Sequence, residues 1–330
     1  MTSIKPPLTL LVLVAATALA ACGGSSSGSA GSKLALTAYS TPKEAYAEII
    51  PAFKSTSAGA GVSFTESYGN SGDQARAIIA GLPTDVAALS LEPDVAKLVK
   101  ENLVPATWNA TPTKGIVTRS VVVLAVRPGN PKHVKGWADL VRPGIQVLTP
   151  NPFTSGGARW NVMAAYGAQI EQGSSPAQAE AYLGRLFKNV VVQDKSAREA
   201  LQSFTGGKGD VLISYENEAI TAQQKGEKLD YVIPDQTILI ENPIAATTKG
   251  GAKAKAFVDF ATSERAQKIF AAKGYRSVIA KLVDKAKYPD PPKLFDITKL
   301  GGWDAVSKTF FDPKASVMQR IEGGLGVSTS

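Results

Sequence analysis

Four times along this chain a short apolar stretch is followed by a turn and then by residues that typically begin a helix. The apolar stretches predict strands at 34–39, 62–68, 145–149 and 190–193. A Ser or Thr that can cap a first helical turn follows each strand within a few residues. Strands that alternate with helices in this way indicate an α/β fold with mostly parallel sheets. The helices then begin at the carboxyl ends of the strands, along one edge of each sheet.

Three of the helix starts match a capping box, in which a Ser or Thr and the residue three positions later bind each other's backbone N–H groups. These matches begin at Thr41, Ser71 and Ser196, and the fourth helix follows Ser155. The first N–H groups of a helix have no acceptor within it and carry a partial positive charge. Four converging starts therefore predict an anion site, whereas any single cap is explained by the stability of its own helix.

Two long apolar stretches, at 120–126 and 237–246, separate these junctions into two groups. We interpret them as crossings between two lobes. The predicted body is a two-lobed α/β fold in which each lobe is a mainly parallel sheet flanked by helices, and the ligand lies in the cleft between the lobes. Lobe 1 is predicted to contain residues 33–118 and 246–330, and lobe 2 residues 119–245.

The N-terminal residues predict a targeting sequence that is not part of the folded body. Residues 8–21 are apolar, are too short for a membrane span and end in small residues before Cys22. They predict a signal peptide over residues 1–21, and the sequence around Cys22 resembles the lipobox of bacterial lipoproteins, in which the cysteine is lipidated. Residues 22–32 form a Gly/Ser tether. We therefore expect an exported protein that is anchored to the outer face of the cytoplasmic membrane.

The composition argues against several kinds of chemistry. The 330 residues include 36 Lys and Arg, 28 Asp and Glu, one His and one Cys. One cysteine cannot form an internal disulfide, and one His with one Cys cannot supply a typical zinc site. We expect no metal, no cofactor and no enzyme activity. The basic residues are dispersed, which argues against nucleic-acid binding, while the net charge of +8 attracts anions.

Several segments resemble the sulfate/thiosulfate-binding proteins, the extracytoplasmic receptors of bacterial sulfate import transporters. Residues 151–160 (NPFTSGGARW) resemble the signature of this family, and residues 67–75 (SYGNSGDQA) resemble a second motif. Further matches follow in the family's order at 126–132, 137–144, 209–218 and 301–303. The resemblance covers residues 33–310 and points to the actinobacterial lipoprotein form.

The resemblance implies a type II periplasmic-binding-protein fold and a monomeric receptor that delivers sulfate to an ABC transporter permease. Members of the family hold a dehydrated sulfate between the lobes with neutral donors alone. Carried over by position, the Ser155 hydroxyl donates to the anion, and the other donors are main-chain N–H groups. The site residues implied in this way are Ser40, Ser71, Ser155, Gly156, Gly157 and Ala197, with Tyr215 at a seventh position.

Two of these positions depart from the family pattern. Many members carry Asp where this chain has Ser40, a change that keeps the backbone donor and removes a negative charge. Sulfate-specific members carry Trp, and thiosulfate-binding members can carry Phe, where this chain has Tyr215. A tyrosine can donate through its hydroxyl or pack as an aromatic ring beneath the cleft. Sulfate, thiosulfate and a broader range of oxyanions therefore stay open as ligands.

Two other classes of function stay open from the residues. Ser155 is a candidate nucleophile for an exported hydrolase, although it lacks the G-x-S-x-G context and His133 is the only histidine. A lipoprotein of the same fold that senses its ligand without transporting it is the other alternative. Glu216 and Glu218 lie two positions apart, on different helix faces, so we expect them to be solvated or ion-paired and not an acid/base couple.

Overall fold

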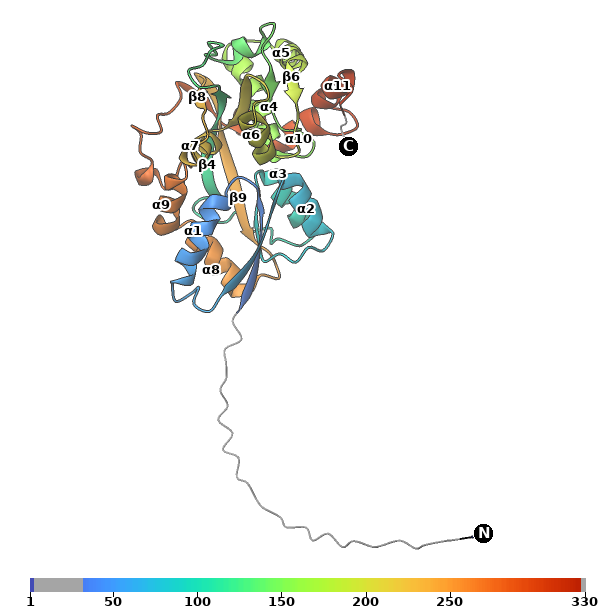
Figure 1. The fold of residues 1–330 in the computed structure, drawn as a ribbon, viewed down its shortest axis with the longest axis vertical. Coiled ribbons are helices and arrows are strands. Elements are labelled where there is room, and N and C mark those ends of the chain that lie inside the picture. Colours follow the sequence, from blue (N-terminus) through green and yellow to red (C-terminus); the bar gives the residue numbers. More distant parts are fainter. Residues whose placement is uncertain (3–31, 328–330) are drawn as a thin grey trace. The chain divides into compact units, whose positions relative to one another are not determined.

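The computed structural model describes residues 1–2 and 32–327 (Figure 1). Cys22, together with nearly all of the predicted signal peptide and tether, lies outside the described residues. Residues 31–330 form one compact unit that contains every helix and strand reported below, so a chain that begins at residue 23 keeps all of them. No helix in the described part of the chain is both long and apolar enough to cross a membrane.

One path of hydrogen-bonded strands organises the fold, in the order β2-β1-β3-β9-β4-β7-β5-β6. The strands at the two ends of this path pair in parallel. The long strands β4 and β9 pair antiparallel in the middle and join the two ends. The bounds are β1 (Lys33–Tyr39), β2 (Ser63–Gly69), β3 (Val86–Ala88), β4 (Ile116–Val126), β5 (Val147–Leu148), β6 (Val190–Val192), β7 (Val211–Tyr215) and β9 (Gln236–Ala246). The short strands β8 (Asp230–Val232) and β10 (Lys293–Phe295) pair with β4 and β9.

Helices flank this mixed sheet on both sides (Figure 1). The bounds are α1 (Lys43–Lys54), α2 (Ser71–Ile79), α3 (Glu92–Lys100), α4 (Gly156–Glu171), α5 (Pro176–Lys188), α6 (Ala197–Thr205), α7 (Glu216–Gln224), α8 (Gly251–Ala261), α9 (Glu264–Ala272), α10 (Gly302–Phe311) and α11 (Val317–Gly324). Helices α1, α2, α4, α6 and α7 each follow a strand directly or after a short loop. The predicted alternation of strands and helices is confirmed.

The C-terminal helices pack against α4 and α5, on the half of the sheet that holds β5, β6 and β7. The ring of Trp303 in α10 contacts that of Trp160 in α4 edge-on, with 4.7 Å between the ring centroids. Phe310 contacts Tyr166 in the same way, also at 4.7 Å. These residues belong to one hydrophobic core with α5 and β7. The boundaries expected from the sequence place α10 and α11 with the other half. That half has its own aromatic core between α1, α8 and α9.

The capping box predicted at Thr41 is wrong. The Thr41 hydroxyl is hydrogen-bonded to the hydroxyl of Tyr275, at 3.2 Å, and does not cap α1. The carboxylate of Glu44 is paired with Arg198 in α6, at 2.6 Å. Pro42 precedes the helix without any side-chain cap. Both side chains that form a local box in the prediction are thus taken by partners that are distant in sequence.

The capping box predicted at Ser71 is also wrong, because the helix begins one residue earlier than expected. Asn70 caps α2, and its Oδ1 accepts from the backbone N–H of Asp73 at 2.8 Å. The hydroxyl of Ser71 instead donates to the buried carboxylate of Asp94 at 2.6 Å. Ser155 caps α4 and Ser196 caps α6, as predicted, but the capping box at Ser196 is not completed, because Glu199 accepts the N–H of Lys195 and not that of Ser196.

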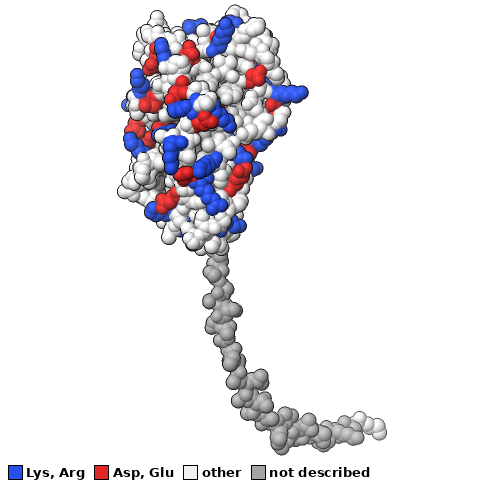
Figure 2. Space-filling view, turned by 90° about the vertical axis from the view of Figure 1, so that its left-hand side faces the viewer, with Lys and Arg blue, Asp and Glu red and all other residues white. Residues whose placement is uncertain are grey.

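Charged residues of both signs are interspersed on the face that carries α1, α7 and α9 (Figure 2). Ion pairs on α1 account for part of this pattern, since Glu44 is paired with Lys225 and Glu48 with Lys273. This face therefore carries no continuous basic patch of the kind that binds nucleic acid.

Trp303→Ala tests the packing of the C-terminal helices. Trp303 is 7% exposed and contacts the central helix α4, so its truncation leaves a cavity in the main core. We expect the free energy of unfolding in urea to fall by about 3–5 kcal/mol, with Trp303→Phe retaining most of the stability. A loss below about 1 kcal/mol for Trp303→Ala would mean that α10 contributes little to this core.

Candidate functional site

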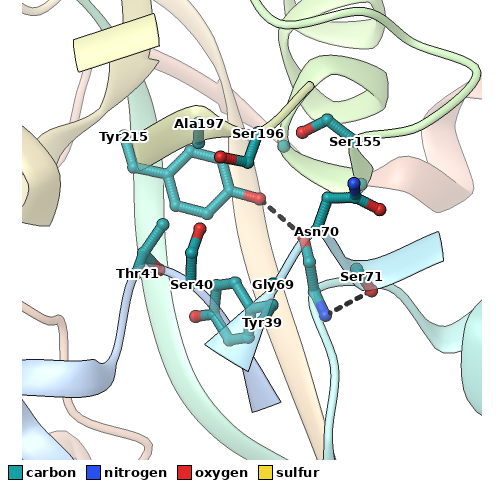
Figure 3. A pocket seen from close by; sticks show the side chains of 13 residues that line it. Tyr39, Ser40, Thr41, Gly69, Asn70, Ser71, Ser155, Ser196, Ala197 and Tyr215 are labelled. Carbon is teal, nitrogen blue, oxygen red and sulfur yellow. Dashed lines mark hydrogen bonds between the residues drawn. The ribbon is translucent and has the colours of Figure 1, made fainter. Parts of the chain in front are cut away.

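A small pocket lies where the N-terminal ends of α2, α4, α6 and α7 meet, beyond the carboxyl ends of the strands (Figure 3). It is much smaller than the pockets of roughly 300–1,000 Å³ that hold drug-sized ligands. None of its side chains carries a charge. The lining residues are Tyr39, Ser40, Thr41, Gly69, Asn70, Ser71, Ser90, Ser155, Gly156, Gly157, Ser196, Ala197 and Tyr215. The pocket suits a small polar solute.

The structure brings all seven residues predicted as site residues together around this pocket. They are Ser40, Ser71, Ser155, Gly156, Gly157, Ala197 and Tyr215. Their role as ligands of an anion stays a prediction. Six further lining residues are not among the predicted ligands, although Thr41 and Ser196 are expected from the sequence as helix caps; the six are Tyr39, Thr41, Gly69, Asn70, Ser90 and Ser196. Most of these adjoin a predicted residue in the chain, but Ser90 follows β3 without any capping pattern, so no local signal identifies it.

Ser155 keeps a donor for a ligand. Its Oγ accepts the N–H of Ala158 at 3.3 Å and so caps α4, while its own N–H donates to the carbonyl oxygen of Asn151 at 2.9 Å. Because the oxygen accepts the cap bond, the hydroxyl proton is left, and it has no acceptor among residues 32–327. The side chain is 3% exposed. Ser155 therefore offers one O–H donor in a nearly dry pocket.

Glycine at 156 is required by a close contact between two elements. A Cβ on Gly156 would lie 2.9 Å from both the Cβ and the Oγ of Ser90. A Cβ on Gly157 would lie 3.3 Å from the Cβ of Ala197, which is also tight. The first turn of α4 thus lies close to two neighbours, the loop after β3 and the first turn of α6. The first-turn N–H groups of these two helices have no acceptor within their own helices.

Ser71 can offer only its main chain to a ligand. Its hydroxyl donates to Asp94, and its Oγ accepts the N–H of Ser90 at 3.0 Å, the second bond drawn in Figure 3. The side chain is therefore fully used within the protein. Its N–H, at the first position of α2, is what remains. This arrangement matches the main-chain role that the family resemblance implies.

Tyr215 and Ser90 share a hydrogen bond across the pocket, with 2.9 Å between their hydroxyl oxygens (Figure 3). Two hydroxyls carry two protons, and this bond uses one of them, so one proton stays available to a ligand. Burial raises the pKa of Tyr215 well above its ordinary value, which keeps the phenol neutral. Ser90 is held in turn, because its carbonyl oxygen accepts from Trp160 and Asn242, both at 3.0 Å. Tyr215 is thus both a buried aromatic and a hydroxyl of the pocket wall.

Charged groups lie behind the pocket wall and do not line it. Arg198, the second residue of α6, donates to the carboxylate of Glu44 at 2.6 and 2.8 Å and to that of Glu218 at 3.0 and 3.1 Å. It also donates to the carbonyl oxygen of Thr41 at 3.1 Å. Burial opposes ionisation of Glu44, but the hydrogen bonds from Arg198 and Lys225 lower its pKa to about 2. These bonds connect α1, on one side of the pocket, with α6 and α7 on the other side.

Glu216 and Glu218 are both ion-paired, and the solvated alternative is wrong because each side chain is fully buried. Arg276 donates to the two oxygens of Glu216 at 2.8 and 3.1 Å. Burial raises the pKa of both glutamates, and the paired arginines oppose this effect. Glu216 begins α7 directly after Tyr215, so its partner fixes the helix that carries a pocket residue.

An α/β fold of mixed sheets flanked by helices, with a small neutral pocket at the helix starts, defines a type II periplasmic binding protein, and this fold class is confirmed by solved structures. A family of bacterial extracellular solute-binding proteins matches residues 34–276. A sulfate-binding protein of Synechococcus elongatus is 43% identical to this chain over 311 residues, which are 89% of each chain. The chain belongs to the sulfate/thiosulfate-binding protein family of bacterial solute-binding proteins.

Two further relatives show the range of this family. A thiosulfate-binding protein of Escherichia coli is 35% identical and spans 87% of this chain and 90% of its own length. The solved structure of the sulfate-binding protein SubI from Mycobacterium tuberculosis H37Rv superimposes with a TM-score of 0.82 at 42% identity, covering 85% of this chain and all of that one. The family consists of binding proteins and not of enzymes, so the hydrolase alternative for Ser155 is wrong.

The pairing of Glu44 with Arg198 predicts a specific acid sensitivity. The folded pKa of Glu44 is about 2, below its ordinary 4.5, so this carboxylate stabilises the fold fully above pH 4.5 and less as the pH falls toward 2. In Glu44→Gln we expect a smaller loss of unfolding free energy between pH 4.5 and pH 2 than in the parent chain. Urea unfolding at a series of pH values measures this, and equal slopes in the two proteins would contradict the assigned pairing.

Proposed function

We propose that this chain is a receptor that captures sulfate in the pocket between its lobes and delivers it to an ATP-driven ABC transporter permease. The observation that carries the proposal is the chemistry of the pocket wall. Helix starts and hydroxyl groups surround a small buried space, and no charged side chain lines it. A receptor of this kind binds its solute reversibly and performs no covalent chemistry.

The pocket offers mainly donors, because four of the side-chain oxygens in its wall already accept hydrogen bonds within the protein. Each of four lining oxygens accepts a backbone N–H of the protein. The four are Asn70 Oδ1, Ser71 Oγ, Ser155 Oγ and Ser196 Oγ, and the donors are Asp73, Ser90, Ala158 and Glu199. Sulfate is fully ionised near neutral pH, carries no proton and only accepts hydrogen bonds. Hydrogen phosphate keeps a proton, and burying that proton without an acceptor costs about 1–3 kcal/mol.

Sulfate-binding and thiosulfate-binding relatives both bear on which anion this chain binds. Sulfate-binding proteins of Synechococcus elongatus and Mycobacterium tuberculosis are 43% and 42% identical to this chain, which favours sulfate. The thiosulfate-binding protein of Escherichia coli, at 35%, keeps thiosulfate as the alternative. The hydroxyl of Tyr215 in the pocket wall favours sulfate as well, because a fourth oxygen is a better acceptor for an O–H donor than the terminal sulfur of thiosulfate.

We further propose that the lobes close over the anion by rotation about β4 and β9. The lobe boundaries expected from the sequence are residues 33–118 with 246–330 against 119–245, and the packing of α10 and α11 favours the motion of these two helices with the second lobe. The contact of Ser90 with Tyr215 and the contact of Arg198 with Glu44 cross between these lobes. Opening would break both contacts, and the bound anion would favour the closed arrangement.

For the N-terminus we propose a signal peptide over residues 1–21 and a lipidated Cys22 that anchors the body to the outer face of the membrane. The support for this is the sequence alone. Mass spectrometry of the protein isolated from membranes would detect the lipid on the N-terminal cysteine. A sensing lipoprotein of the same fold stays the alternative to transport, and loss of sulfate uptake on deletion of the gene would argue against it.

Ser155→Ala tests the pocket at one atom. The variant loses a hydroxyl donor to a charged ligand, so we expect sulfate binding to weaken by about 1.5–3 kcal/mol, or roughly 10- to 150-fold. Isothermal titration calorimetry measures this effect. Ser263→Ala is the matched control, because Ser263 caps α9 through the N–H of Ala266 at 3.4 Å and lies outside the pocket. Equal weakening in both variants would indicate a general loss of stability.

Titration of the chain from residue 23 with three anions tests the choice of ligand. After exhaustive dialysis from sulfate-free buffer, we expect one-to-one binding of sulfate at neutral pH and no binding of phosphate, because four lining oxygens already accept backbone N–H groups and the donors that remain suit a fully ionised anion. Preferential binding of thiosulfate would assign this chain to the other branch of the family. If none of the three anions binds detectably, the proposed receptor function is rejected.

A further inference from the structure

A basic groove lies beside the pocket, on the outer side of the starts of α2 and α4. Its volume is about 730 Å³, and it is open to solvent. Four of its side chains are cationic and only one is acidic. The lining residues are Asp73, Arg76, Pro93, Lys97, Phe153, Thr154, Arg159, Lys195, Ser307, Phe311 and Pro313.

Two of the four cations have no carboxylate partner. Arg76 is paired with Asp73, and Lys97 with the buried Asp94 at 2.8 Å. The side-chain nitrogens of Arg159 and Lys195 have no Asp or Glu oxygen within 4.0 Å in the part of the chain that the structure describes, although the backbone N–H of Lys195 donates to the carboxylate of Glu199 at 3.1 Å. The groove therefore holds two positive charges that the protein does not neutralise, a local excess that attracts anions.

Arg159 is held in one position although it lacks an ionic partner. Its Nε donates to the carbonyl oxygen of Pro152 at 2.9 Å, and the guanidinium lies over the ring of Phe311 at 5.1 Å. Burial lowers the pKa of Arg159, and the nearby charge of Arg76 acts in the same direction, although Asp94 opposes it. Ser307, also in the groove, has a buried hydroxyl without a hydrogen-bond partner within residues 32–327. A fixed guanidinium and an unused hydroxyl suit an oxyanion.

The groove adjoins the pocket at two consecutive residues. Thr154 lines the groove, and the next residue, Ser155, lines the pocket. On the other side, a Cβ on Gly72 in α2 would lie 3.0 Å from the carbonyl oxygen of Thr154. Under the proposed lobes, this contact is where the two lobes meet at the edge of the pocket.

We propose that this groove is a second, weaker binding site for small divalent oxyanions, which collects them at the mouth of the pocket. The proposal rests on the proposed function, because the collected anion is the one that the pocket receives. The two sites differ in the range and in the strength with which they attract the anion. Cations exposed to solvent attract an anion over about 10 Å but hold it weakly, whereas the buried neutral donors hold it tightly and act only at contact.

Nuclear magnetic resonance of the chain from residue 23 tests the groove directly. Sodium sulfate is added at constant ionic strength against sodium chloride, and the backbone amides of Thr154, Lys195 and Ser307 are followed. We expect these signals to shift in a saturable way at millimolar sulfate, after the pocket signals of Gly157 and Ala197 have responded at stoichiometric sulfate. Millimolar affinity corresponds to about 4 kcal/mol, as expected for a few exposed charges.

Two double variants decide the result. Lys195→Gln with Arg76→Gln removes two charges of the groove, and we expect the millimolar shifts to disappear. Lys54→Gln with Lys228→Gln removes two exposed charges elsewhere and has to leave them unchanged. Groove shifts that are absent, that rise without saturation or that survive the first double variant would overturn the second site. Groove shifts without any response from Gly157 and Ala197 would support the groove and reject the receptor function.

The same variants have a kinetic consequence. Stopped-flow measurement of sulfate association, followed by tryptophan fluorescence at low ionic strength, should give a rate constant about 10-fold lower for the groove variant than for the control. The dissociation rate constant should stay unchanged, because the pocket itself is intact. At about 0.5 M sodium chloride the difference should disappear, since salt screens exposed charges. Equal association rates at low ionic strength would contradict the collecting role.

Discussion

The convergence of helix starts on one small space is the constraint on which the rest of this structure depends. The first N–H groups of α2, α4 and α6 have no acceptors within their helices, and burying such groups without a partner is costly. Their approach requires a residue without a Cβ at Gly156, where a methyl group would contact Ser90. It also requires strands whose carboxyl ends point to the same place, which the parallel pairing of β1, β2 and β3 and of β5, β6 and β7 provides.

The charges of the molecule are arranged so that the pocket stays neutral. Arg198 and Arg276 are each used by buried glutamates, Glu218 and Glu216, on the far side of the pocket wall. A cation inside the pocket would attract any anion, whereas oriented neutral donors discriminate by the number of acceptors and protons that the ligand carries. Under the proposed second site, long-range attraction is left to the groove outside, where Lys195 is exposed and Arg159 is partly buried.

Ser90 shows why part of this site could not be read from the sequence. It follows β3 within an apolar segment and has no capping pattern. Its hydroxyl nevertheless bonds to Tyr215, and its carbonyl oxygen accepts from Trp160 and Asn242. Its side chain also leaves no room for a Cβ at position 156. Each of these partners is distant in the chain. The errors at Thr41 and Ser71 have the same origin, because partners distant in sequence, Tyr275 and Asp94, replace the local backbone as the partners of these hydroxyls.

The sequence by itself determined the features that depend on local order. The alternation of strands and helices, the caps at Ser155 and Ser196 and the glycines that follow Ser155 are set by neighbours within a few positions, so they were predictable, and the family resemblance added Ser40, Ala197 and Tyr215 to the pocket. Only the tertiary structure decided which hydroxyls remain free to donate, which helices share the core of α4, and that the charged side chains surround the pocket without entering it. The physical reason is that a hydroxyl or a charge binds whichever partner the fold brings closest, and that partner is specified by packing over the whole chain and not by the adjacent residues.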